Sequence, residues 1–247
     1  MDRQPAPTLA DQFAAALDWW RDAGVDSDYV EEPANLLAEP VAPPPPAPVA
    51  AKAAREEPPP PPVARIGGDR GGWPAALADF APWWLGEPSL DPAPAGTRVP
   101  PRGVAGAQLL VLVPMPEAGD TEQLLSGKHG QLVSAMLRAM GIAPDAAYIA
   151  AALPRHTPVP DWEGLKAAGL GDVLLHHLAL AAPRRVLVLG QDVLPLLGLE
   201  KRRGVCNLPL AESALPLLAS LAPDILLGTP RARADLWRRW LDWTGTA

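Results

Sequence analysis

Two side chains with acid–base chemistry lie in segments that are able to hold a reacting group. Glu117 lies in the turn at residues 114–119, and His156 lies in a proline-rich loop further along the chain. A carboxylate or an imidazole in such a place can orient a water molecule or transfer a proton. Glu117 and His156 are therefore the candidate catalytic residues. The alternatives are a solvated turn carboxylate for Glu117 and a DNA-facing loop residue for His156, while His129 is predicted to face solvent or a phosphate at a helix start.

The turn at residues 114–119 follows an unbroken apolar run. Residues 109–113 read Leu-Leu-Val-Leu-Val, and residues 130–140 then place apolar side chains at helical spacing. An apolar run that is cut by proline and glycine predicts a parallel strand buried on both faces, here followed by a helix. Because ligands bind outside the carboxyl ends of the strands in open α/β sheets, this turn is the predicted pocket.

The same alternation continues to the end of the chain. Further strands are predicted near residues 147–152, 185–189 and 216–220, and further helices at residues 172–181, at residues 192–197 and from Thr229 onward. Strands that alternate with helices at these lengths predict a three-layer α/β fold, with helices on both faces of a four-stranded parallel sheet. This domain is expected to span residues 71–247.

The N-terminal part of the chain has a different character. Residues 1–32 contain a short amphipathic helix whose stripe includes Phe13, Leu17 and Trp20, and residues 33–62 contain 12 prolines. A segment with so much proline is predicted to be an extended spacer, so residues 33–70 form the expected linker. The helix is marginal on its own, so its stripe should be buried. Two alternatives remain open, namely docking on the chain's own body and recognition of a protein partner.

The charge is unevenly distributed. The net charge of −7 arises within residues 1–39, which carry nine acidic residues and two arginines, so the rest of the chain is balanced. The body is not a strongly basic nucleic-acid binder by composition, and any DNA contact must depend on local patches. Helix starts favour anions, so the predicted phosphate contacts are Gly127 and Lys128 at one helix start and Arg231 and Arg233 at another. The Lys-Arg-Arg cluster at residues 201–203 is a further predicted phosphate contact, and the alternative for it is a solvated face.

The cysteine count limits the cofactors. Cys206 is the single cysteine, which excludes an intramolecular disulfide and any cluster that needs several thiolates from this chain. Neither an apolar signal core nor a run of about 20 apolar residues is found, so we expect a soluble cytoplasmic protein without a membrane partner. No metal site is predicted.

Several segments resemble the motifs of one family, in the same order. The strand and turn at residues 109–119 resemble a strand leading into Gly-Glu-Ala-Pro-Gly, residues 127–133 resemble Gly-x-x-Gly-Gln-Leu-Leu, and Tyr148-Ile149 resembles Tyr-Ile-x-Asn. Residues 183–190 resemble its Pro-x-x-(apolar)-x-Gly strand. Residues 215–237 resemble a strand into Thr-Leu-His-Pro followed by a Pro-x-x-Lys-x-x-x-Trp helix. From about Trp73 to Trp243 the chain resembles the uracil-DNA glycosylase superfamily, most closely its iron–sulfur branch, family 4.

The resemblance implies a glycosylase-like fold and a link to base-excision DNA repair. The family's catalytic Glu, Asn and His correspond to Met115, Ala151 and Ala222 in this chain, and the four cluster cysteines are absent. Loss of one preorganised donor typically costs about 10² to 10³ in rate, so we expect little or no glycosylase activity and no iron–sulfur cluster. The predicted pocket lining consists of these three residues together with Pro114, Pro116 and Gly119 of the turn.

An adaptor is the alternative function. A degenerate glycosylase-like body behind an N-terminal partner-binding peptide is similar to the psi accessory subunit of the bacterial DNA polymerase III clamp loader. The resemblance implies a protein partner from the DNA replication or repair machinery, bound through the N-terminal helix, and it leaves DNA as a second partner.

The cysteine count yields a first prediction. We expect the purified protein to be colourless, because one thiolate from Cys206 cannot hold an iron–sulfur cluster. Visible absorption and iron analysis measure this directly. A brown protein with stoichiometric iron would contradict the prediction.

Overall fold

A computed structural model of the protein describes residues 8–24, 65–91, 98–210 and 213–245. The chain divides into two compact units, Met1–Pro59 and Pro60–Ala247. Most of the predicted linker at residues 33–70 therefore lies outside the described residues. Its last part does not, because Ile66 is buried in the core of the second unit and its amide donates to the Ala168 carbonyl. The body begins before residue 71, where the sequence placed its boundary.

The described part of the first unit is the helix α1 (Leu9–Asp22). Thr8 and Asp11 form a capping box, since the Asp11 amide donates to the Thr8 hydroxyl and the Thr8 amide donates to the Asp11 carboxylate. These bonds satisfy amides that a helix start leaves without partners. The predicted amphipathic helix is thus present, and none of its residues is buried.

The second unit is built on a five-stranded sheet with the order β2-β1-β3-β5-β4. The strands are β1 (Leu109–Val113), β2 (Ala147–Ala151), β3 (Val186–Leu189), β4 (Gly204–Leu210) and β5 (Ser213–Ser220). The pairs β1–β2, β1–β3 and β3–β5 are parallel, as predicted for the four strands that the apolar runs located. The fifth strand, β4, pairs antiparallel with β5, so the prediction of a four-stranded parallel sheet is corrected.

The sequence of β4 explains why it was not predicted. It contains Gly204, Asn207 and Pro209, which are residue types that strands disfavour. Proline is tolerated there because β4 is an edge strand, where a missing amide breaks no ladder in the interior. Only Gly204 and Leu208 of the strand are buried, so β4 lacks the continuous apolar run of the central strands.

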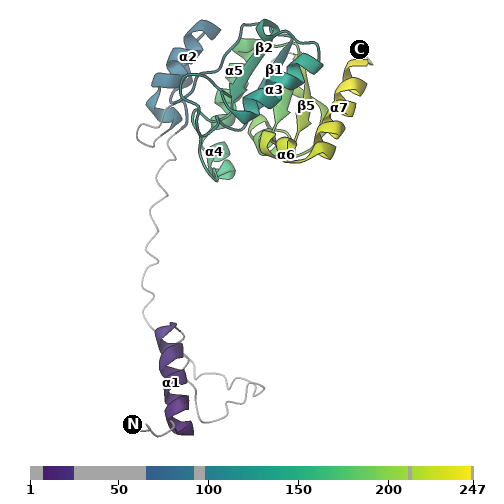
Figure 1. The fold of residues 1–247 in the computed structure, drawn as a ribbon. Helices are drawn as coiled ribbons and strands as arrows, with labels where there is room; N and C mark the ends of the chain where they lie inside the picture. The colour runs from purple at the N-terminus through teal and green to yellow at the C-terminus, as the bar shows by residue number, and fades with distance from the viewer. Residues whose placement is uncertain (1–7, 25–64, 92–97, 211–212, 246–247) are drawn as a thin grey trace, which may run out of the picture. The chain divides into compact units, whose positions relative to one another are not determined.

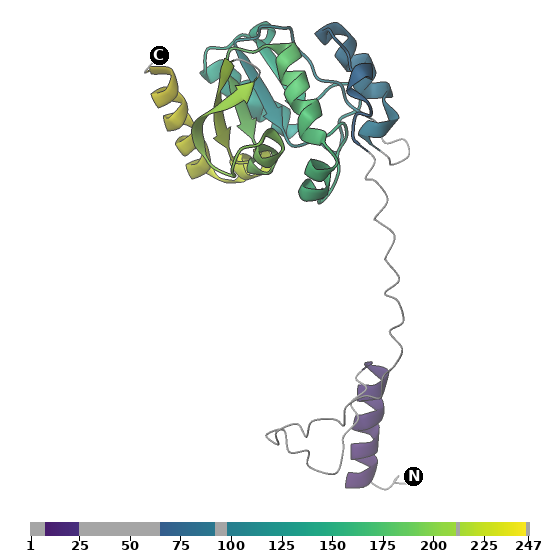
Figure 2. The same cartoon turned by 180° about the vertical axis from the view of Figure 1, so that it is seen from behind.

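Helices cover both faces of the sheet. Figure 1 shows α3, α6 and α7 on one face, and Figure 2, from behind, shows α5 on the other. The α-helices of this unit are α2 (Leu77–Gly86), α3 (Lys128–Ala139), α4 (Trp162–Ala167), α5 (Leu170–Ala181), α6 (Pro223–Gly228) and α7 (Pro230–Gly245). The described residues of this unit also contain four 3₁₀ segments, namely η1 (Arg70–Gly72), η2 (Pro88–Leu90), η3 (Pro144–Ala146) and η4 (Gln191–Leu197). Within the described ranges, no helix combines the length and apolar character that crossing a bilayer requires.

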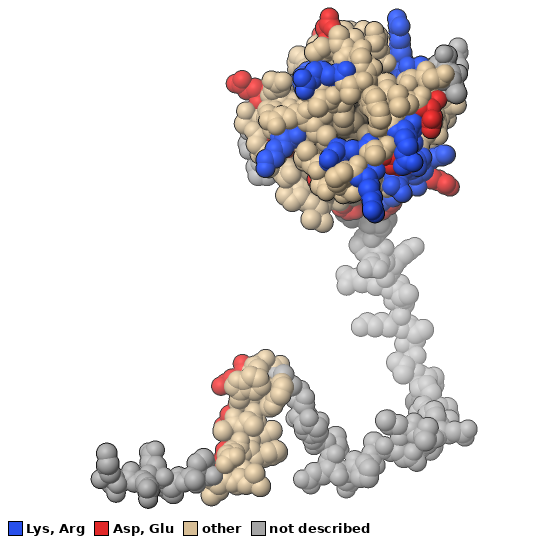
Figure 3. Space-filling model, turned by 45° about the vertical axis from the view of Figure 1, so that its right-hand side comes forward, with Lys and Arg blue, Asp and Glu red and all other residues tan. Residues whose placement is uncertain are grey.

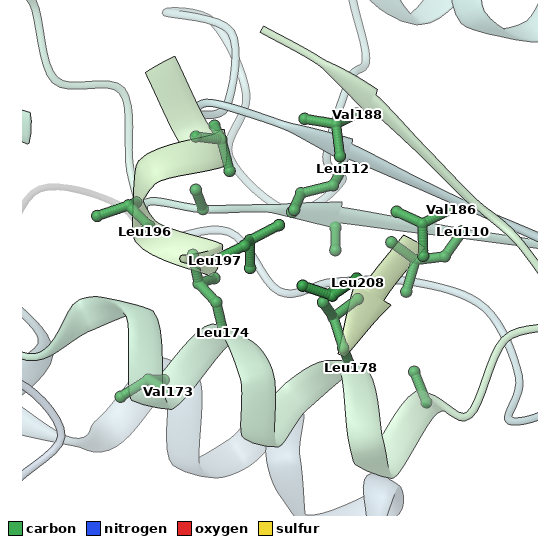
Figure 4. Packing of buried hydrophobic residues seen from close by; sticks show 14 of the residues in the cluster. Leu110, Leu112, Val173, Leu174, Leu178, Val186, Val188, Leu196, Leu197 and Leu208 are labelled. Carbon is green, nitrogen blue, oxygen red and sulfur yellow. The ribbon is translucent and has the colours of Figure 1, made fainter. Parts of the chain in front are cut away.

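The central strands are apolar throughout because both of their faces are covered. On one side Leu110 and Val186 face Leu174 and Leu178 of α5, as Figure 4 shows. On the opposite side the alternate strand residues pack against α3, α6 and α7, with Trp240 of α7 buried among them. This double burial accounts for the Leu-Leu-Val-Leu-Val run of β1, whose five residues are all buried.

Two adjacent histidines fix α2 and the residues before it to α5. The buried ring of His177 stacks on Phe80 with 3.8 Å between centroids, and its Nε2 lies 2.8 Å from the Tyr148 hydroxyl. The Nε2 of His176 lies 2.8 Å from the Pro74 carbonyl oxygen. The pair has a packing role, and it joins the start of the body to its core.

The buried histidine makes stability dependent on pH. Burial, with a smaller effect of neighbouring His176, lowers the pKa of His177 from 6.5 to about 3. Between these values the unfolded state binds more protons, so stability is complete above about pH 6.5 and falls on acidification. We expect the free energy of unfolding to drop by ~2 kcal/mol between pH 7 and pH 5 through this residue.

Urea unfolding at both pH values tests the contribution of His177. The His177→Gln variant should be less stable at pH 7, because it loses the stack on Phe80, and should lose less stability on acidification. His176→Gln, on the same helix, is the matched control and should keep the wild-type pH dependence. An identical pH dependence in wild type and His177→Gln would contradict the prediction.

Candidate functional site

The carboxyl ends of three parallel strands meet at Gly190. A Cβ atom placed on this glycine would lie 2.5 Å from Cγ of Pro114 and 3.9 Å from Cβ of Ala222. Its φ of +133° is one that L side chains rarely adopt. Gly190 therefore lets the turns after β1, β3 and β5 pack closely, and it brings together two residues of the predicted pocket.

The other predicted lining residues are dispersed. Met115 packs partly buried against the core cluster on the α5 side of the sheet, whereas Ala151 is buried in the cluster on the α3 side. Pro116 is buried, and Gly119 is exposed. The three positions at which the resembled family carries catalytic side chains thus hold apolar side chains, two of them packed on opposite faces of the sheet.

Glu117 is bound to the start of α3. Its carboxylate accepts hydrogen bonds from the amides of Gly127 and His129 at 2.8 Å each, and from the amide of Gly130 at 3.3 Å. The side chain is only 13% exposed. A carboxylate at this place complements the positive end of the helix and satisfies amides that have no partner within it. The Glu117 carboxylate is thus a helix cap rather than a solvated turn carboxylate.

This cap competes with the phosphate contacts that were predicted at the same helix start. The Gly127 amide already donates to Glu117, so a phosphate would have to displace a charged group of the chain. The His129 ring also faces the cap, with Nδ1 at 3.7 Å from Oε1 of Glu117. Lys128 is exposed and remains accessible to an anion.

A second buried carboxylate, which the sequence did not single out, holds the rest of the loop. Asp120 is 6% exposed and accepts from the amides of Glu117, Leu125 and Ser126 at 2.8 Å each, and from the Ser126 hydroxyl at 2.6 Å. Burial alone would raise the pKa of Asp120, but the hydrogen bonds from Ser126, Leu125 and Glu117 outweigh it and lower the pKa. The charged form of Asp120 is therefore part of the fold.

The loop and the helix approach each other so closely that only glycine fits at one position. A Cβ atom on Gly130 would lie 1.8 Å from the carbonyl oxygen of Leu125. Leu125 itself has a φ of 59°, which is unusual for a leucine, and its amide is held by Asp120. The glycines of the Gly-Lys-His-Gly segment thus serve the packing of the loop between β1 and α3.

His156 lies beside the same turn. Its Nδ1 is 3.1 Å from the carbonyl oxygen of Pro116, and since a carbonyl can only accept, Nδ1 carries the proton in this contact. The other ring nitrogen, Nε2, is then an acceptor in the neutral ring. The structure thus brings this candidate, which follows β2, to the turn that follows β1.

The two predicted arginine contacts differ. Arg233 donates through Nη1 to the carbonyl oxygens of Leu226 and Leu227, at 2.6 and 2.8 Å, and so caps the end of α6. Arg231 is exposed at the start of α7. Of these two, Arg231 presents its side chain to solvent, while Arg233 has an intramolecular role.

A cavity of about 480 Å³ lies near His156 but away from the predicted pocket. It is bordered by the ion pair between Asp91 and Arg155 and by apolar side chains, including Ile66 and Leu165. None of the predicted lining residues borders it. Among the residues that the structure describes, no group of three or more His, Cys, Asp or Glu could hold a metal ion.

Comparison of the chain with protein-family models and with curated proteins gives no match. The functional assignment therefore depends on the residues and contacts of the chain itself and on the motif resemblance.

The capping role of Glu117 is testable through stability. We expect Glu117→Ala to lower the free energy of unfolding by about 1–3 kcal/mol, because three amides at the start of α3 lose their acceptor. Glu117→Gln should cost less, since its amide oxygen still accepts. Glu122→Gln, an exposed acid in the same loop, is the matched control and should be close to neutral. Unfolding in urea measures the effect, and a Glu117→Ala variant as stable as wild type would contradict it.

Proposed function

We propose that this protein is a uracil-DNA glycosylase-like adaptor that recruits a protein of the DNA replication or repair machinery and has little or no glycosylase activity. The observation that carries the proposal is the apolar face of α1. Leu9, Phe13, Leu17 and Trp20 are 83%, 66%, 44% and 51% exposed on a capped helix of 14 residues. An isolated helix of this length is marginal in water, so a protein groove that covers the stripe would stabilise it.

The size of the stripe fits specific recognition. Full burial of a large apolar side chain contributes about 1.5–3 kcal/mol, and a few aromatic anchors usually dominate a helix-in-groove interface. Phe13 and Trp20 lie about two helical turns apart on the same face, and anchors of a helix that binds in a groove recur at this i, i+7 spacing. The acidic residues of the same segment favour a partner with a basic rim.

The chemistry of the body supports an adaptor over an enzyme. Cleavage of a glycosidic bond requires a group that orients water and a donor that stabilises the departing base. Met115, Ala151 and Ala222 provide neither at the positions that the resemblance identifies. Glu117, which lies two residues after Met115, already accepts hydrogen bonds from three backbone amides.

One observation favours a second candidate, a glycosylase with a rebuilt site. His156 lies at the turn after β1 with Nε2 able to accept a proton, because its Nδ1 donates to Pro116. In that function His156 would be a general base or would steady charge on the sugar.

Uracil release separates the two candidates. We expect no detectable release from uracil-containing single- or double-stranded oligonucleotides, since the groups that would stabilise the transition state are absent. An active glycosylase of the resembled family serves as the positive control. Release that His156→Ala abolishes, while His129→Ala retains it, would establish the rebuilt enzyme instead.

The α1 stripe is tested by affinity capture with the full chain and identification of what it retains. We expect a replication or repair protein, with Phe13→Ala and Trp20→Ala together weakening its binding at least tenfold, because both anchors are lost. The matched control joins Ala14→Ser and Ala15→Ser, which lie off the stripe and lower helix propensity, and it should bind normally. A retained protein that both variants hold equally would exclude the stripe as the recognition surface.

A further inference from the structure

The start of β4 and the middle of α7 lie side by side at one edge of the sheet. Gly204, the first residue of β4, pairs with Ala219 near the carboxyl end of β5, and Arg202 and Arg203 come directly before it. A Cβ atom on Gly204 would lie 3.1 Å from Nη1 of Arg239, so the glycine lets this guanidinium lie against the strand.

Three arginines, Arg203, Arg238 and Arg239, lie around Asp235 of α7, and Arg202 directly precedes Arg203 in the chain. We call these four arginines the basic surface. Asp235 of α7 lies among them, at 2.9 Å from Nε of Arg239 and 3.6 Å from Nη2 of Arg238. The hydrogen bond from Arg239, together with the charges of Arg239, Arg203 and Arg238, lowers the pKa of Asp235, so this carboxyl stays ionised. Asp235 and Asp242, the two carboxylates of α7, carry two negative charges against four arginines, so positive charge is left over.

The leftover charge faces solvent. The side chain of Arg238 is 73% exposed and that of Arg239 is 38% exposed, while Arg202 and Arg203 are also exposed. Figure 3 shows Lys and Arg side chains gathered on the lower right of the body, on the side that carries α7. Lys201 is less available, because it pairs with Asp192 at 2.6 Å.

We propose that the basic surface binds the phosphodiester backbone of a single-stranded nucleic acid. All four cations are arginines, whose planar guanidinium donates two parallel hydrogen bonds to a phosphate and also stacks on bases. Trp237 precedes Arg238 on α7 and is 36% exposed, and exposed aromatic side chains are groups on which unpaired bases stack. The chemistry of the surface therefore favours a strand with accessible bases over an acidic protein segment.

This surface includes Arg202 and Arg203 of the predicted cluster at residues 201–203, but none of the phosphate contacts predicted at helix starts. Gly127 and Arg233 are occupied by Glu117 and by the end of α6, whereas the basic surface is formed where β4, an unpredicted strand, meets α7. The proposal does not require α1 or the adaptor function, and it requires no glycosylase activity.

The test measures binding of a fluorescent single-stranded DNA oligonucleotide without uracil to the full chain by anisotropy at several salt concentrations. Each phosphate contact contributes about −0.7 to the slope of log affinity against log salt. We expect Arg202→Ala with Arg203→Ala to make the slope shallower by about 1.4 and to weaken binding on the order of tenfold at low salt. Arg238→Ala alone should make the slope shallower by about half as much.

A charge-matched control removes two exposed cations of α3 and α4, which are not part of the basic surface. Arg138→Ala with Lys166→Ala leaves the basic surface intact, and this variant should keep the wild-type affinity and slope. Thermal unfolding of every variant shows whether it is folded, and the exposed positions of Arg202, Arg203 and Arg238 make wild-type midpoints the expected result.

Three results would overturn the proposal. The first is absence of oligonucleotide binding at low salt, and the second is an equal loss of binding in the control variant. The third is tighter binding of polyglutamate than of DNA at matched charge, lost in the Arg202 and Arg203 variant, which would assign the surface to acidic protein segments. A shallower slope confined to the basic-surface variants would establish the proposal.

Discussion

The contact between the Glu117 carboxylate and the first amides of α3 determines what the carboxyl end of this sheet can do. A helix start attracts anions, and here the anion belongs to the chain. Asp120 repeats the arrangement within the preceding loop, where it holds the amides of Leu125 and Ser126. A loop whose amides are satisfied from within is rigid, but it has few donors left for a substrate phosphate or a departing base. The region favours structural stability over the recognition of an external anion.

The strands that the sequence predicted are those whose two faces are both buried. β1 and β3 read as continuous apolar runs because helices cover each face, and such runs are visible without knowledge of their partners. β4 was missed because its outer edge faces solvent and its sequence includes glycine and proline. The start of the body was placed too late for a related reason, since the burial of Ile66 depends on contacts with distant residues such as Ala168. Apolar runs in a sequence indicate which strands are buried. A single contact between distant segments produces no such pattern.

The candidate site shows the same limit at the level of side chains. The sequence placed Glu117 in the turn after the first strand, yet its role depends on amides ten or more residues further on. Asp120 was not singled out from the sequence, although Asp is among the residue types that accept hydrogen bonds from free backbone amides near a helix start. Arg233 was assigned to phosphate because a helix start favours anions, but its long side chain reaches back to the carbonyls of α6. The positions of charged residues can be read from the sequence, but the groups that they contact can be identified only from coordinates.

The distribution of charge suits a protein that joins partners more than one that performs chemistry. Catalysis needs several polar groups held at one pocket, whereas the Glu117 and Asp120 carboxylates near this sheet end are bonded within the fold. The described residues include two exposed features of different kinds, an apolar stripe in an acidic segment and a surface of arginines on the body. An apolar stripe is recognised by a protein groove and an arginine surface by phosphates, so the two need not compete for one ligand. If both proposals hold, the chain joins a protein and a nucleic acid without acting on either.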